Sequence, residues 1–170
     1  MAKPLQWKSA QARAMVETIA KDVAEFFGVP VPEVIQPYEP RDFSWQFDAG
    51  TIWTKAGAAE ITVSVSKRFA TLYFRFADPA RAESVFQMSR HDQRLNRFSG
   101  KWNHHAGPDS WANNGRPCPE TSLDVFRAEL RRDFRKVADR NPCPDEVAAY
   151  HVLEAAKTAA FQDMLATLPR

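Results

Sequence analysis

Between residues 43 and 76 the chain alternates apolar and polar side chains, and this repeat constrains the fold more than any other feature. A two-residue repeat places alternate side chains on opposite faces of a β-sheet. In residues 61–66, Ile, Val and Val alternate with Thr, Ser and Ser, and a Lys67-Arg68 turn precedes a returning segment at 69–76. This pattern predicts an antiparallel hairpin with one face buried and the other in water.

Residues 43–54 predict another hairpin. Three aromatic residues alternate with polar ones, and Asp48-Ala49-Gly50 has the composition of a turn. We therefore expect two short strands, one on each side of that turn. A further strand is expected at residues 99–104.

Helical periodicity surrounds these strands. Residues 9–27 carry apolar side chains at three- and four-residue spacing, and Gly28 supplies a stop signal. A short helix is expected after Asp78, which has the side chain of an N-cap. Two longer helices are expected at 121–139 and 144–168, each starting with acidic residues in its first turn.

Together these segments predict a single α+β domain over residues 1–170. The expected architecture is an antiparallel sheet of four to five strands, with an N-terminal helix and two C-terminal helices packed on it. Hydrophobic residues make up 44% and charged residues 26%, which excludes wholesale disorder. No stretch reaches 18 apolar residues and no apolar leader is present, so we expect a cytoplasmic protein with no membrane partner.

Positive charge is concentrated in one part of the chain. The net charge is only +2, which is too balanced to imply a polyanion partner, but residues 90–140 hold 11 Lys or Arg against 7 Asp or Glu. Within this region Arg127, Arg131 and Arg135 follow one helix face at four-residue spacing and could line a phosphate backbone. Acidic residues interleave with them, as in a solvated, self-paired helix face. Both interpretations stay open.

Four residues could carry metal or nucleophilic chemistry, and their spacing argues against it. Zinc sites usually pair their ligands with two to five residues between the two members of a pair. Cys118 and Cys143 are much farther apart, and His104 and His105 are adjacent. Cys143 at a helix start could serve a Cys/His enzyme, although a capping role explains its position equally well. No phosphate-binding, dinucleotide-binding or hydrolase fingerprint is present, so we predict no catalytic residue, no metal and no cofactor.

The most unusual composition lies between Arg94 and His105. This segment holds Arg94, Arg97, Lys101, Phe98, Trp102 and both histidines named above. Aromatic residues among cations suit stacking on bases or contacts with a protein partner. The alternative is a glycine-containing turn into an edge strand, with Trp102 in the core.

One local pattern resembles an RNA-recognition motif. Residues 67–74, Lys-Arg-Phe-Ala-Thr-Leu-Tyr-Phe, match most of that family's third-strand octapeptide, and a helix follows as in the family. Arg68 replaces the glycine of the octapeptide and Thr71 replaces a stacking aromatic. The matching upstream strand is also missing, so the likeness indicates a shared strand–helix pattern and not homology.

A second resemblance concerns residues 95–103, Leu-Asn-Arg-Phe-Ser-Gly-Lys-Trp-Asn. They are similar to an LN-x-x-SGKWN motif of small uncharacterised phage and prophage proteins, and the likeness spans about residues 61–105. The resemblance implies a phage or mobile-element origin. Small phage proteins of this kind often bind and block a host complex, including CRISPR–Cas effectors.

The leading hypothesis is therefore a non-catalytic, anti-CRISPR or anti-defence type protein that occludes a host protein or nucleoprotein complex. Its expected contact residues are Arg97, Lys101, Trp102, His104, Arg127, Arg131 and Arg135. One alternative is direct nucleic-acid binding through residues 90–140, and another is a small enzyme with a Cys/His site. The sequence sets no oligomeric state.

Overall fold

The computed structural model describes residues 7–37, 43–67, 70–86 and 123–168, together with the backbone of residues 95–96 and 101–106. The chain divides into two compact units, Met1–Arg140 and Asn141–Arg170. The first unit contains the sheet, and the second consists of one long helix with its flanking residues.

Helix α1 (Ser9–Phe27) forms where its periodicity predicts it. Its buried face includes Ala12, Val16, Ile19, Val23, Phe26 and Phe27. The helix ends at Gly28, which has a φ of 67° and donates its amide hydrogen to the carbonyl of Ala24 at 3.0 Å. Glycine adopts such a left-handed conformation at little cost, so the predicted stop signal is confirmed.

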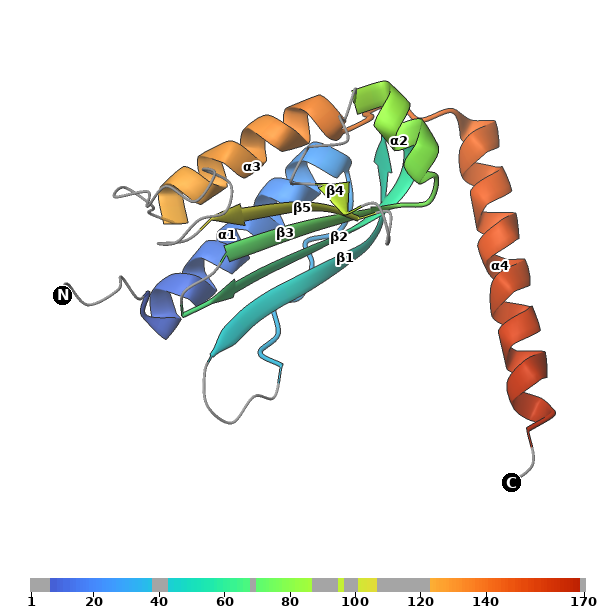
Figure 1. Cartoon of the computed structure of the whole chain (residues 1–170), viewed down its shortest axis with the longest axis horizontal. Coiled ribbons are helices and arrows are strands. Elements are labelled where there is room, and N and C mark those ends of the chain that lie inside the picture. The colour runs from blue at the N-terminus through green and yellow to red at the C-terminus, as the bar shows by residue number, and fades with distance from the viewer. Residues whose placement is uncertain are drawn as a thin grey trace. The chain divides into compact units, whose positions relative to one another are not determined.

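The first unit is built on an antiparallel sheet. Strands β1 (Ser44–Thr54), β2 (Gly57–Ser66) and β3 (Ala70–Phe76) pair in sequence order. Strand β5 (Lys101–Ala106) pairs antiparallel with β3, and the short β4 (Leu95–Asn96) pairs with β5. The resulting order is β1-β2-β3-β5-β4, as the strand labels in Figure 1 show.

The predicted hairpin turn at Asp48-Ala49-Gly50 is wrong. Strand β1 runs through these residues and pairs with β2 on both sides of a register shift. The turn chemistry serves a β-bulge instead, because Asp48 Oδ1 accepts the Gly50 amide hydrogen at 2.8 Å and Gly50 has a φ of 66°. The chain reverses only at Lys55 and Ala56.

Helix α3 (Leu123–Val137) lies beside α1, and both cover the same face of the sheet (Figure 1). Its predicted apolar stripe is buried: Leu123, Phe126, Leu130, Phe134 and Val137. The ring of Phe134 lies 5.5 Å from that of Phe27 and 6.3 Å from that of Phe74 on β3. The prediction of an α+β fold, with an antiparallel sheet packed against an N-terminal and a C-terminal helix, is confirmed.

Two shorter segments flank the sheet. Helix α2 (Pro79–Phe86) follows β3, and its predicted N-cap is confirmed because Asp78 Oδ1 accepts the Arg81 amide hydrogen at 2.9 Å. The proline-rich connector after α1 runs along β1, where Ile35 and Gln46 exchange two backbone hydrogen bonds of 2.8 and 3.0 Å.

The second unit contains helix α4 (Pro144–Ala166), with Cys143 at its N-cap and Pro144 in its first turn, as its sequence predicts. None of its residues is buried. The predicted packing of this helix on the sheet stays a prediction. Among the described helices, none is both long enough and apolar enough to cross a membrane.

Candidate functional site

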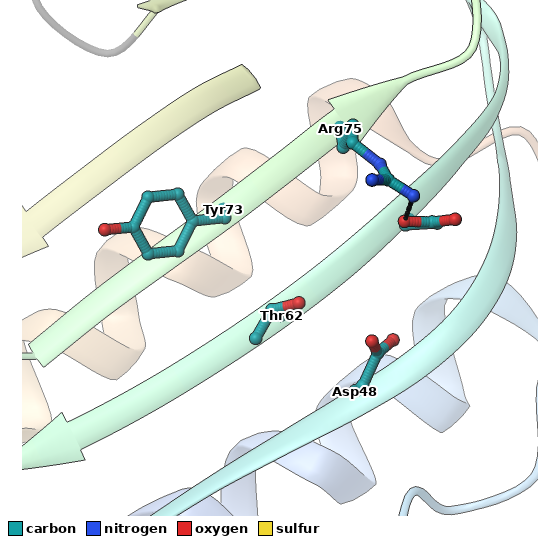
Figure 2. Close-up of a pocket in the computed structure, with 5 residues that line it drawn as sticks. Asp48, Thr62, Tyr73 and Arg75 are labelled. Carbon is teal, nitrogen blue, oxygen red and sulfur yellow. Dashed lines mark ion pairs between the residues drawn. The ribbon is translucent and has the colours of Figure 1, made fainter. Parts of the chain in front are cut away.

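The side chains of the sheet divide between its two faces. The alternation that sends Ile61, Val63, Leu72 and Phe74 into the core sends their neighbours to the opposite, solvent-facing side. On that side lies a hollow of about 380 Å³, which we call the sheet hollow (Figure 2). It is lined by Asp48, Glu60, Thr62, Tyr73 and Arg75.

Strand register brings these five residues together from three strands. Asp48 of β1 lies opposite Thr62 of β2, which in turn lies opposite Tyr73 of β3. In the next row on the same face, Glu60 lies opposite Arg75. Directly opposed residues in an antiparallel sheet have Cβ atoms about 5 Å apart, so the two rows form one continuous polar surface.

The bulge in β1 sets one side of the hollow. Asp48 accepts the hydrogen bond from Gly50 described above, which fixes its carboxylate at the point where the register of β1 shifts. Within the described part of the chain, Asp48 makes no ion pair. Its second carboxylate oxygen therefore offers an acceptor to a partner.

An ion pair forms the other side. Arg75 contacts the carboxylate of Glu60, and the two side chains are 54% and 39% exposed. Such exposed pairs contribute little to stability, about 1 kcal/mol at most. The main consequence is orientation, because the pair holds the guanidinium toward β2, while the ring of Tyr73, on the same face of β3, points away from it (Figure 2).

The hollow presents side chains that can hold a partner by hydrogen bonds and ion pairs. It combines two carboxylates, one guanidinium, a phenol and a hydroxyl, and its lining includes neither cysteine nor histidine. Elsewhere among the described residues, no cluster of three His, Cys, Asp or Glu side chains could hold a metal ion. Tyr73 is 36% exposed, which leaves part of its ring available for contact.

The expected contact residues on the SGKWN segment lie next to this site along the sheet. In the register of β5 against β3, Lys101 lies opposite Arg75, a residue of the hollow. Trp102 and His104 lie opposite Phe74 and Leu72, whose side chains face the core. Arg97 lies outside the described residues.

The expected contact residues on α3 lie elsewhere. Arg127 donates hydrogen bonds of 2.7 and 2.9 Å to Asp22 of α1, and Arg131 contacts the same carboxylate. Asp22 is almost fully buried, with 4% of its side chain exposed. The hydrogen bond to Asp22 raises the pKa of Arg127 above its usual value. These two arginines therefore join α1 to α3 on the helix-covered face, while Arg135 remains exposed in the last turn of α3.

Of the four residues considered for nucleophilic or metal chemistry, Cys143 alone has a described side chain. Cys143 is an exposed free thiol at the start of α4, in the second unit. His104 and His105 are described by their backbone in β5 alone, and Cys118 falls outside the described residues. No described contact joins a cysteine to a histidine.

Sequence reasoning did not select the residues of the sheet hollow, although part of the signal was present. The alternation in β3 assigned Tyr73 and Arg75 to one face, and that in β2 assigned Thr62 to one face. What the alternation lacks is the register that aligns those faces and the identity of the face that the helices cover.

No protein family model, no curated protein and no solved structure matches this chain.

Proposed function

We propose that this chain is a non-catalytic binding protein of the phage or mobile-element type, which occludes a host macromolecular complex such as a CRISPR–Cas or other defence complex. It would act in the cytoplasm of the bacterial host. The observation that carries the proposal is the sheet hollow, a polar and aromatic depression on a sheet face that faces solvent.

The composition of the hollow favours a protein partner. Tyrosine and arginine are enriched among the residues that dominate binding energy at protein interfaces, and Tyr73 and Arg75 lie on the same strand face. The carboxylates of Asp48 and Glu60 outnumber the one guanidinium, so the hollow would repel a phosphate backbone. A partner segment that presents a Lys or Arg beside hydrogen-bonding groups fits this surface best.

The phage-like motif supports the same location. Strands β5 and β4, the fourth and fifth of the sheet, contain parts of the LN-x-x-SGKWN segment, and β5 lies directly beside β3. We therefore propose that the contact surface extends from the hollow across Lys101, with Arg97 as a further contact. Trp102 and His104 lie opposite core-facing residues, so the sheet register assigns these two positions to the other face. In this proposal Arg127 and Arg131 join the two helices, which removes them from the contact surface.

The direct test is affinity capture from a bacterial lysate with the full chain, with and without nuclease, read by mass spectrometry. The same capture is run with Asp48→Arg, which reverses the charge of the hollow, and with Glu33→Arg, which makes the same change at an exposed connector residue. A partner that survives nuclease, is lost with Asp48→Arg and is kept with Glu33→Arg, and that rebinds when purified, supports the proposal.

Other outcomes identify the alternatives. Partners that disappear with nuclease in every variant indicate nucleic-acid binding through residues 90–140, and affinity would then fall steeply with salt. Loss of biological activity on Cys143→Ser, with binding intact, would indicate the Cys/His enzyme. Lys101→Ala, opposite Arg75 of the hollow, should weaken partner binding and leave the melting temperature within a few degrees, whereas Trp102→Ala, opposite the buried Phe74, tests whether the motif is structural, which a collapse of stability would show.

A further inference from the structure

Helix α4 leaves a large apolar surface in water. It spans Pro144–Ala166, about 35 Å at the α-helical rise, and buries none of its residues. Large exposed apolar side chains gather on one side of it and just after it, at Leu153, Phe161, Met164, Leu165 and Leu168, and Val152 lies on the opposite side. Isolated helices gain most of their stability from packing, and contiguous exposed apolar surface usually marks an interface. The helix therefore needs a partner.

The sequence of α4 contains one stripe suited to a helix partner. Val147, Glu154, Phe161 and Leu168 follow at intervals of seven, and Tyr150, Lys157 and Met164 follow in the same way three residues later. These are the a and d positions of a heptad repeat, which face the partner in a two-helix coiled coil. The stripe is apolar at both ends, and its middle consists of Glu154 and Lys157.

This stripe is complementary to itself when reversed. If two copies of α4 run antiparallel about a point between residues 155 and 156, Val147 faces the partner's Met164 and Tyr150 faces the partner's Phe161. Glu154 then faces the partner's Lys157, and the two-fold axis repeats this pair. Every layer between residues 147 and 164 thus joins two apolar residues or two opposite charges.

We propose that α4 is a homodimerisation helix, which pairs antiparallel with α4 of a second copy of this chain. Isologous pairing about a two-fold axis is the commonest way in which soluble proteins associate. Within one helix Lys157 Nζ already lies 2.7 Å from Glu154 Oε1, so both charges sit at the same level of the stripe. In the dimer, Glu154 and Lys157 of both copies come together, so two acidic and two basic side chains neutralise one another.

The central charges favour a second copy of α4 as the partner. Burial of Glu154 and Lys157 against an apolar surface would leave two charges without partners. Only a surface with the reversed pattern supplies both counter-charges at the correct level, and α4 itself is such a surface. This inference goes beyond the proposed function and does not depend on it.

The test is sedimentation equilibrium of the full chain and of three variants. Wild type should dimerise. Lys157→Glu places four acids at the centre of the pair and Glu154→Lys places four bases there, so each variant alone should dissociate at least roughly tenfold more readily. Mixed in equal amounts, the two variants should form a heterodimer, because each acid then faces a base. Val152→Asp, on the opposite face of the helix and 71% exposed, should dimerise like wild type.

The mixing step separates pairing from folding, because a variant that had merely lost its helix could not be rescued by a second variant. A monomeric wild type would overturn the proposal. Variants that dimerise as well as wild type would place any dimer contact elsewhere. Failure of the mixture to associate would refute the antiparallel register, and dissociation by Val152→Asp would refute the assigned face.

Discussion

The two faces of β3 show how one strand serves two purposes. Leu72, Phe74 and Phe76 face the helices and are buried, while Tyr73 and Arg75, one position along the chain, face solvent in the sheet hollow. The backbone and its pairing with β2 are common to both sets. Because side-chain direction alternates strictly in a strand, residues that stabilise the fold and residues available for binding can be changed independently.

The largest expected difference between the faces is in stability. Phe74 is fully buried, and its ring lies 6.4 Å from Phe27, 5.8 Å from Phe76 and 6.3 Å from Phe134. Phe74→Ala should therefore lower the free energy of unfolding by about 3–5 kcal/mol, as for other buried aromatic side chains. Chemical denaturation followed by circular dichroism measures this value. A loss below about 1 kcal/mol would mean that the aromatic cluster does not form in solution.

A second contrast compares a buried and an exposed carboxylate, each paired with arginine. Asp22 is buried between α1 and α3 and contacts Arg127 and Arg131, whereas Glu60 pairs with Arg75 on the solvent-facing side. Asp22→Asn should cost about 2 kcal/mol of unfolding free energy, because it removes the buried carboxylate that binds two half-buried guanidinium groups. Glu60→Gln should cost less than about 1 kcal/mol. Equal losses in denaturation experiments would contradict the difference in burial.

The sequence predicts which residues share a face of a strand or helix better than it predicts which elements contact one another. Alternation located β2 and β3, and three- and four-residue spacing located α1 and the buried stripe of α3, because each signal is local and depends on the neighbouring few residues. Arg127 and Arg131 were correctly assigned to one helix face, but their partner Asp22 lies more than 100 residues earlier in the chain. No local pattern encodes such a contact.

The same limit explains the error in β1. Asp48 and Gly50 have the chemistry of a turn, and that chemistry is used, but in a bulge within a continuing strand. A turn and a bulge require the same hydrogen bond and the same left-handed glycine, so only pairing with β2 distinguishes them. The sheet hollow depends on this pairing, which is why its residues could be assigned to strand faces but not to one site.

The bulge itself gives a smaller effect that tests this explanation. A Cβ at position 50 would meet no atom within 4 Å, so Gly50→Ala changes only the backbone energy at a φ of 66°. The expected loss is about 1 kcal/mol of unfolding free energy. Gly28→Ala, with a φ of 67° and equally open surroundings, is the matched variant at the end of α1. Only Gly50→Ala should also weaken partner binding, because only it disturbs the position of Asp48; equal binding by both variants would argue against the bulge as part of the site.

The smallest effect on stability is expected for Tyr73→Ala, the nearest neighbour of Phe74 in the chain. Tyr73 is 36% exposed on the solvent-facing side, and loss of the cross-strand contacts of its ring should lower the free energy of unfolding by about 1 kcal/mol or less. If the sheet hollow is the contact surface, the same change should weaken partner binding by at least about 2 kcal/mol, as for a central aromatic residue of an interface. Calorimetric titration with the captured partner measures the binding loss, and Tyr73→Phe distinguishes the ring from its hydroxyl group. A Tyr73→Ala protein that binds normally would move the contact surface away from the hollow, whereas one that unfolds like Phe74→Ala would show that the two faces of β3 are not independent.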